Sequence, residues 1–476
     1  MTGQSPGAAV TGQAPQEVVE RALAAARCDD CVVIAEESSS ANLRWAGNTL
    51  TTNGVSRSRQ LTVIAIRRDG DEATVGVMSR AGVRDDQVAG VVRAAEQAAA
   101  GGSPAQDARP LLAPGDGLAA ASNGWDDPVT STGIGVFGSL APALGDAFSM
   151  AAAGGRKLYG FAEHSLTSAF LGSSSGLRLR HDQPAGYLEI NAKSADLARS
   201  AWAGTATRDF ADVDVTGLEA GLARRLDWAT RRTELPAGRY EVVLPPSAVA
   251  DLMIYLYWSA GARDALDGRS VFSKPGGGTR VGDRLASVPL TLRSDPAAPG
   301  LESAPFVISR ASSRDSSVFD NGLALAPTDW IRAGELAALT QTRYSAGLSG
   351  MAVTPEIGNL TLQAPGGAAS LDDMIAGTGR GLLLTCLWYI RAVDPQSLLL
   401  TGLTRDGVYL VENGEVTAAV NNFRFNESPV ALLGRIAEAG ATTATLPREW
   451  GDYFTRAAMP PLRVDGFNMS SVSQAS

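Results

Sequence analysis

Short β-prone runs separated by turn-forming residues dominate this chain, and they constrain its fold more than any other feature. Near the start, apolar and β-branched residues gather in four runs, at 31–35, 41–46, 61–66 and 72–78. Ser38-Ser39-Ser40 and the stretch from Asn48 to Gly54 separate the first three runs, and such residues are typical of turns. Closely spaced strands with short connections predict an antiparallel meander.

Helical patterns flank this meander. Apolar residues recur at helical spacing after Pro15, and the segment 85–99 places valines and alanines on one face. Further elements expected in the first half are helices at 135–153 and 218–230, a hairpin of 159–171 with 177–180, and a strand at 187–192. We therefore predict an N-terminal α+β domain of antiparallel strands with flanking helices over residues 15–235. Its flexible connector is expected at about 101–123, where Gly, Ala, Pro and Asp prevail.

The second half begins with a strand at 239–244 and an apolar helix that starts near Ser247. Beyond them nearly every segment alternates as a strand does, apart from a late helix expected at 430–439. The sequence predicts a C-terminal domain at 236–469, mostly antiparallel β with a few helices. The polar ends, residues 1–14 and 470–476, are expected to be disordered tails because they carry too little apolar surface to order themselves.

Composition excludes several classes of function. The 476 residues carry 50 acidic and 41 basic side chains, a net charge of −9, which argues against nucleic-acid binding. No run of about 18 apolar residues predicts a membrane span. The first residues lack the basic start and apolar stretch of a secretory signal, so we expect a cytoplasmic protein. Three cysteines do not make a disulfide framework, and a reducing compartment fits their scarcity.

Some short motifs suggest chemistry, but a structural role explains each of them better. Cys28 and Cys31 have CxxC spacing, yet no second ligand pair is present and acidic residues lie between the thiols. The stretch Gly172–Gly176 matches the letters of GxSxG, but a strand rather than a helix follows it, so a hairpin tip is expected. Cys386 lies in an apolar run and is expected to be a buried core thiol.

The chain contains two histidines, His164 and His181, so one copy cannot build a three-histidine metal site. If the hairpin pairs its strands suitably, the two could form two corners of a metal site with Glu163 and Asp182. No third ligand is evident, and half-buried histidines are the simpler expectation. The roles of both histidines, and of Cys28 and Cys31, stay open at this point.

Several segments in the same order resemble the TldD/PmbA family of candidate gyrase modulators and microcin-processing peptidases. The first is Asn42–Asn48 followed by Leu61–Val63, which resembles the opening strands of the family. The C-terminal segments resemble its signature and are residues 371–379, Trp388–Pro395, Leu400–Gly407 and Glu412–Glu415. The resemblance covers nearly the whole chain after the N-terminal tail.

The resemblance distinguishes two kinds of subunit. In the TldD kind, the helix that opens the second domain carries an HExxxH motif for catalytic zinc, and a cysteine near the C-terminus supplies the third ligand. The matching helix here has neither histidine nor glutamate. Its degenerate counterpart positions are Asp251, Met253, Ile254, Tyr257 and Trp258, and the segment 448–453 lacks the cysteine. The chain therefore resembles the TldE, or PmbA, kind, and we assign it no metal, no cofactor and no catalytic residue.

Six residues of the family signature are candidates for peptide binding or for a structural role: Tyr389, Arg391, Asp394, Thr401, Arg405 and Asp406. The resemblance implies a heterodimer with a TldD-type subunit that carries the zinc and cuts unfolded or flexible peptides. A β-rich domain with free strand edges is compatible with binding an extended peptide. The residues leave two alternatives open, a self-sufficient homodimeric peptidase or peptide-modifying enzyme with an unrecognised site, and a non-enzymatic peptide-binding scaffold.

Overall fold

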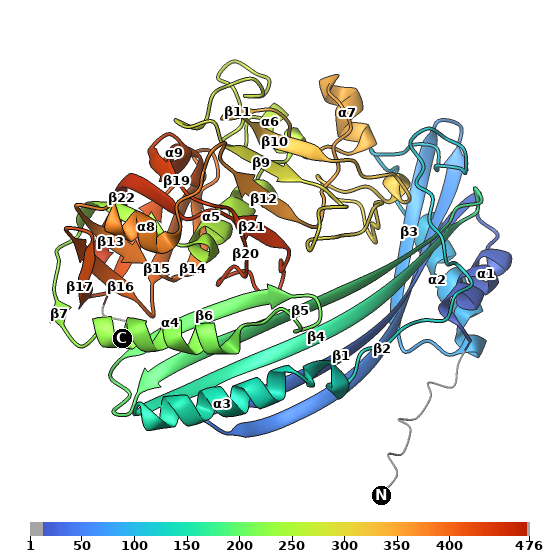
Figure 1. Cartoon of the computed structure of the whole chain (residues 1–476). Helices are drawn as coiled ribbons and strands as arrows, with labels where there is room; N and C mark the ends of the chain where they lie inside the picture. Colours follow the sequence, from blue (N-terminus) through green and yellow to red (C-terminus); the bar gives the residue numbers. More distant parts are fainter. Residues whose placement is uncertain (1–12, 474–476) are drawn as a thin grey trace, which may run out of the picture.

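A six-stranded antiparallel sheet of long, curved strands forms the N-terminal half (Figure 1). The computed structural model describes residues 13–473. The strand order is β3-β2-β1-β4-β5-β6. The strands are β1 (Asp30–Trp45), β2 (Leu50–Asp69), β3 (Glu72–Ala81), β4 (Arg156–Ser173), β5 (Arg178–Ser194) and β6 (Ser200–Thr207). The α+β class and the antiparallel character predicted for this half are confirmed.

The turn predicted at Ser38–Ser40 is wrong, and the turn predicted at Asn48–Gly54 is correct only at Asn48 and Thr49. β1 continues through the three serines because β2 and β4 pair with it on both sides. The side chains join this pairing, since Ser38 Oγ lies 2.9 Å from Thr167 Oγ1 across the sheet. The true turn is confined to 46–49, and the next residue already belongs to β2. Pairing between distant segments therefore outweighs the local turn preference.

Four helices cover one face of this sheet. They are α1 (Pro15–Ala25), α2 (Val88–Ala100), α3 (Leu140–Ala153) and α4 (Val215–Trp228). Cys31, Val33 and Ala35 pack toward α1 and α2. Farther along the same strand, Ala41, Leu43 and Trp45 pack toward α3 and α4. Because side chains alternate along a strand, these odd-numbered residues share one face, so all four helices lie on that face.

The opposite face of the sheet packs on the C-terminal half, as Figure 1 shows. Val32 and Ile34 of β1 belong to a buried cluster with Leu171 and Leu179 of the neighbouring strands. The C-terminal half contributes Phe306, Val318, Phe319 and Leu323 to the same cluster. The continuous apolar run at the start of β1 therefore reflects a strand buried on both faces.

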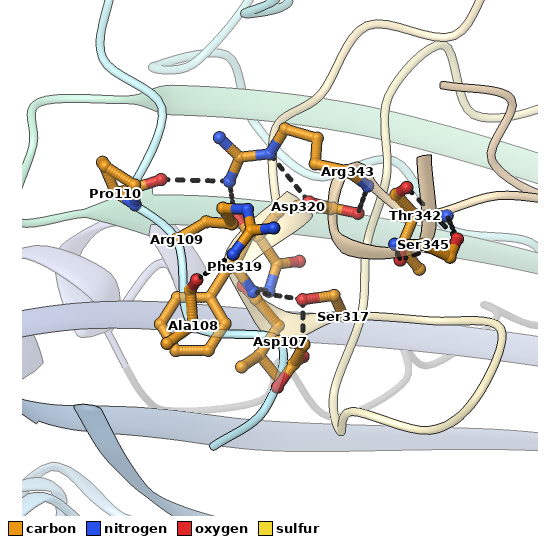
Figure 2. Close-up of polar contacts among 12 residues, drawn as sticks. Asp107, Ala108, Arg109, Pro110, Ser317, Phe319, Asp320, Thr342, Arg343 and Ser345 are labelled. Atoms are coloured by element: carbon orange, nitrogen blue, oxygen red, sulfur yellow. Dashed lines mark hydrogen bonds and ion pairs between the residues drawn. The ribbon is translucent and has the colours of Figure 1, made fainter. Parts of the chain in front are cut away.

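The connector at 101–123 contains no helix or multi-residue strand, and it is hydrogen-bonded to the C-terminal half (Figure 2). Asp107 accepts a hydrogen bond from Ser317 Oγ at 2.7 Å. Arg343 donates to the carbonyl oxygen of Pro110 at 3.0 Å and is itself paired with Asp320. These contacts hold the middle of the connector, which the sequence predicts to be flexible, against the second half.

Two sheets and a central helix build the C-terminal half, and the predicted β-rich character is confirmed. One sheet has the order β11-β10-β9-β12-β21-β20, and the other β14-β15-β18-β22-β8-β13-β16-β17-β7, with β19 beside β22. The strands of the first are β9 (Thr291–Ser294), β10 (Thr328–Arg332), β11 (Glu335–Leu336), β12 (Leu360–Gln363), β20 (Thr443–Thr445) and β21 (Ala457–Met459). Those of the second are β7 (Arg232–Thr233), β8 (Gly238–Leu244), β13 (Arg380–Leu384), β14 (Leu387–Asp394), β15 (Leu399–Thr404), β16 (Val408–Glu412), β17 (Glu415–Val420), β18 (Phe423–Glu427), β19 (Ile436–Ala439) and β22 (Leu462–Val472).

Short helices complete this half around the longer α5 (Pro246–Trp258). They are α6 (Ala262–Leu266), α7 (Arg343–Ser349), α8 (Leu371–Ala376) and α9 (Pro429–Leu433). The helix expected at 430–439 is half wrong, because α9 ends before Gly434 and β19 follows. The chain also stays in β22 through Val472, past the expected start of the C-terminal tail at Ser470. Residues 1–12 and 474–476 of the expected tails lie outside the described residues.

Candidate functional site: a cleft at the end of helix α5

Helix α5, the counterpart of the zinc-motif helix, lies in the core of the C-terminal half. Apolar residues on nearly all its sides pack into one cluster with strands of both sheets, as expected for a helix that is hydrophobic all round. Met253 and Ile254 are completely buried. Tyr257 is also buried, and its hydroxyl donates to the carbonyl oxygen of Ile357 and accepts from the same residue's N–H. These positions therefore support the core. None of the described helices, α5 included, is long and apolar enough to cross a membrane.

Asp251 is the one carboxyl group on α5, and it is completely buried. Its Oδ1 accepts the backbone N–H of Glu449 at 2.8 Å, while its Oδ2 has no hydrogen-bond partner among the described residues. Burial raises the pKa of Asp251 well above the ordinary aspartate value. A raised pKa disfavours metal binding by this carboxyl group, because metals bind the deprotonated form.

The exposed end of α5 meets the segment 448–453 and the edge strand β14, and an aromatic cleft of about 550 Å³ lies between them. The ring centroids of Trp258 and Trp450 are 5.3 Å apart in an edge-to-face arrangement. The cleft is lined by Trp258, Trp388, Tyr389, Arg391, Glu449, Trp450 and Tyr453. Of these, Tyr389 and Tyr453 are 56% and 77% exposed, so the cleft presents aromatic faces to solvent.

Glu449 fixes the geometry of β14 at this cleft. Its carboxylate accepts the backbone N–H groups of Tyr389 and Ile390 at 2.9 and 3.1 Å, and Arg391 Nη1 lies 2.9 Å from it. The register of β14 against β15 shifts between Trp388 and Arg391, and Tyr389 has a φ of +53°. A left-handed tyrosine at a strand irregularity is a strained arrangement that the Glu449 carboxylate holds in place.

The face of the N-terminal sheet that packs on the C-terminal half also contacts the segment 448–453. Arg448 stacks between Trp202 and Trp388, at 5.1 and 4.3 Å from the ring centroids, and lies 3.4 Å from Glu189. Tyr187 donates a hydrogen bond to Asp452 at 3.2 Å. Residues 448–453 therefore connect the cleft to the N-terminal sheet.

The six predicted signature residues do not form one site. Tyr389 and Arg391 line the cleft beside Trp258. Asp394 instead accepts hydrogen bonds from Gln396 and Ser397 in the turn after β14. The other three, Thr401, Arg405 and Asp406, are not among the residues that line the cleft. Asp406 accepts from Ser200 Oγ at 2.6 Å and so joins the two halves.

Sequence reasoning missed Glu449, Trp450 and Tyr453 as members of this cleft. The segment that contains them is noticeable in the sequence only as the place where a cysteine ligand is missing. Its acidic residue beside an aromatic one could have indicated a binding role, but its partners in β14 lie about sixty positions earlier in the chain.

The two histidines hypothesised as corners of a metal site lie on opposite faces of the sheet. In the hairpin, His164 pairs with Gly186 and His181 pairs with Ala169, an odd offset that sends the side chains apart. The His164 nitrogens lie 2.8 Å from Thr132 Oγ1 and 2.7 Å from the Arg208 carbonyl oxygen. Among residues 13–473, no three His, Cys, Asp or Glu side chains are grouped so that they could hold a metal ion.

Cys31 is 1% exposed at the start of β1, and Cys386 is equally buried beside Trp202 and Leu446, as expected for a core thiol. Cys28 is partly buried, and its thiol donates to the carbonyl oxygen of Asp30. The stretch Gly172–Gly176 is the tip of the β4–β5 hairpin, as predicted.

Comparisons with known proteins agree with this architecture. Residues 237–471 match the model of the PmbA/TldA metallopeptidase C-terminal domain. The fold of the whole chain is similar to TldE from Thermococcus kodakarensis, at 16% identity over 95% of this chain and 99% of that one, with a TM-score of 0.74. No curated protein matches significantly. Residues 237–471 are thus a domain of the PmbA/TldA metallopeptidase family, and the whole chain has the metallopeptidase-like α+β fold of the TldD/PmbA proteins.

Two further solved structures share the fold. One is a candidate modulator of DNA gyrase from Thermotoga maritima, with 16% identity, coverage of 95% of this chain and 99% of that one, and a TM-score of 0.74. The other, from Bacteroides thetaiotaomicron, has a similar description, 16% identity, coverage of 96% and 98%, and a TM-score of 0.73. At this identity the likeness concerns the fold alone.

Proposed function

We propose that this chain is the non-zinc subunit of a TldD/TldE-type heterodimeric metallopeptidase that processes or degrades unfolded or flexible peptides in the cytoplasm. The observation that carries the proposal is the chemistry of α5. Where the zinc-bearing kind of subunit has histidines and a glutamate, this helix has core side chains and one buried carboxyl group whose pKa is raised by burial. The residues present do not fit a zinc ion, so any catalytic zinc belongs to the partner.

The cleft supplies the peptide-binding contribution of this chain. Strand β14 ends its sheet, and Arg391, Ala392 and Val393 on it are exposed. An edge strand offers backbone groups to an extended peptide without demanding one sequence, and the aromatic faces of the cleft add apolar contact area. In this proposal the subunit also controls the access of the peptide and stabilises the partner subunit.

Native mass spectrometry of the tagged chain purified from its own cells tests the proposal, because one spectrum reports partner mass and metal together. We expect a 1:1 assembly with a second chain of similar size whose zinc stays with that second chain on dissociation. A homodimer or monomer with its own stoichiometric metal would overturn the proposal in favour of a self-sufficient enzyme. A metal-free chain without any peptidase partner would favour a scaffold.

A variant sharpens the result. Met253→His introduces a histidine where the zinc-bearing kind has its motif helix, but leaves no second ligand within the core packing. We expect the assembly that contains it to hold no additional zinc. Uptake of a second zinc would mean that α5 is closer to a working metal site than its packing indicates.

A further inference from the structure

The described residues form a second cavity, distinct from the aromatic cleft and open to solvent, between the two halves of the molecule. Its volume is about 500 Å³, within the usual range for small-ligand sites, which favour such interfaces. The N-terminal sheet lines it with Thr167, Ala169, His181 and Gln183. The C-terminal half lines it with loops around Phe306 and Glu356 and with Arg456.

Arg456 faces this cavity without a counter-ion. Its Nε donates to the carbonyl oxygen of Gly358 at 2.9 Å, and this is its one hydrogen bond to a described residue. No carboxylate oxygen of the described residues lies within 4.0 Å of its guanidinium group, although burial is strong enough to lower the pKa of Arg456. Because a desolvated cation is costly, proteins normally pair it. The unused guanidinium N–H groups are therefore suited to an anionic group of a ligand.

His181 lies beside this arginine on the cavity wall. Burial, assisted by the nearby Arg456, lowers the pKa of His181, which favours the neutral imidazole ring. Gln183 uses its amide nitrogen to donate to Pro184 and Glu302, so its oxygen accepts from His181 Nε2 at 3.1 Å. Nδ1 of His181 is therefore available as a hydrogen-bond acceptor. Arg456 supplies the positive charge in this part of the cavity.

Two carboxyl groups without partners form an acidic part of the wall. Glu356 has no hydrogen bond or ion pair with the described residues, and Asp315 Oδ1 is buried without a partner. Burial raises the pKa of Asp315. Glu356 lines the same cavity, and its side chain is exposed to solvent. Glu36, which also lines the cavity, is in contrast paired with Arg310. A protonated amine that enters beside Glu356 and Asp315 would pair with both carboxyl groups.

We propose that this cavity binds a small zwitterionic ligand, a short peptide with free termini, whose carboxylate pairs with Arg456 and whose amino group pairs with Glu356 and Asp315. The cavity wall also includes Phe306, Val307 and Ile308, which suit apolar side chains. A lone anion would leave the carboxyl groups unpaired, and a lone cation would leave Arg456 unpaired. The inference goes beyond the proposed function, because it concerns this chain alone and needs neither zinc nor a partner.

Titration calorimetry of the purified full chain with dialanine and dileucine tests the proposal. We expect both dipeptides to bind, and their C-terminal amides and N-acetyl derivatives to bind at least tenfold more weakly. Arg456→Met should lower the affinity for the free acid to that of the amide, whereas Arg456→Lys should keep part of the preference. Glu356→Gln should remove the preference for a free amino group. Arg380→Met, at a 70% exposed arginine outside the cavity, is the matched control.

Equal binding of dipeptides and their blocked derivatives would overturn the proposal, as would no binding at millimolar concentration or full affinity in Arg456→Met. Binding of inorganic phosphate with displacement of the dipeptide would assign the site to anions and also contradict it. Circular dichroism of each variant separates loss of binding from loss of folding. None of these results changes the partner and zinc content seen by mass spectrometry, so the two proposals fail independently.

Discussion

Two arginines near the same cavity are held in opposite ways. Arg343 donates from Nε to Asp320 at 2.8 Å and from Nη2 to the carbonyl oxygens of Pro110 and Phe319 (Figure 2). Asp320 also accepts the backbone N–H of Arg343. Among residues 13–473, Arg456 donates to one backbone carbonyl oxygen and is paired with no carboxylate. The first arginine joins three segments of the chain, and the second is left with donors that the fold does not use. The guanidinium group of Arg343 is used within the fold, which indicates a structural role. Unused donors, as on Arg456, are suited to binding a ligand.

The largest expected effect is at the saturated arginine. Arg343→Met should lower the free energy of unfolding by about 3–5 kcal/mol, because it leaves Asp320, whose side chain is 3% exposed, as an uncompensated buried charge. Urea denaturation followed by tryptophan fluorescence measures the change. The double variant Asp320→Asn with Arg343→Met should recover part of the loss. A loss below about 1 kcal/mol would remove the distinction between the two arginines.

The effect expected at Glu449 is intermediate between those at Arg343 and Arg456, and most hydrogen bonds of the Glu449 carboxylate come from backbone N–H groups. Glu449→Gln should cost about 2 kcal/mol, because the N–H groups of Tyr389 and Ile390 and the guanidinium of Arg391 lose a charged acceptor. The exposed Glu415 gives the control Glu415→Gln. In a double-mutant cycle, Arg391→Met should add little to Glu449→Gln. Full additivity would show that the three donors do not act through one carboxylate.

Asp251 is a buried acidic side chain with few partners, so its effect on the free energy of unfolding should depend on pH. Below the ordinary value of 3.8, the folded and unfolded chains both hold the proton. Between that value and the raised pKa of the folded state, only the folded chain keeps it, so wild-type stability falls as pH rises. Asp251→Asn has no such proton. Its stability relative to wild type should rise by about 1 kcal/mol between pH 4 and pH 7 in denaturation curves. A difference that is constant with pH would mean that Asp251 is ionised in the fold.

The smallest effect on stability is expected at Arg456. Arg456→Met should leave the free energy of unfolding unchanged or raise it by up to about 1 kcal/mol, since it removes a desolvated cation at the expense of one hydrogen bond. Thermal denaturation with and without dialanine measures this, and the ligand should stabilise wild type alone. A clear loss of stability would show that Arg456 has a structural partner after all.

The sequence predicted the kinds of element well where the signal was local. The hairpin around Gly172–Gly176, the helix at 85–99 and the β-rich second half follow from periodicity and turn chemistry. It failed where a distant partner decides, as at Ser38–Ser40, where two neighbouring strands keep the serines extended. The helix predicted at 430–439 failed because Ile436 and its neighbours pair with β22 instead.

The candidate site was predictable in part for the same reason. Tyr389, Arg391 and Trp258 were identified by resemblance, but nothing in their local sequence indicates that a carboxylate from Glu449 joins them. Likewise Arg456 is one of many arginines in the sequence. What distinguishes it is the absence of a counter-ion among the described residues, and that property exists only in the folded chain.

The order of strands in the N-terminal sheet has a consequence for synthesis. β1, β2 and β3 are consecutive in the chain, whereas β4, which covers the other edge of β1, begins only at Arg156. On a ribosome, the first three strands can pair while the second edge of β1 waits for a partner, and such edges invite association with other chains. The polar middle of β1, with Glu36, Glu37 and the three serines, makes that edge a poor template for other chains until β4 is made.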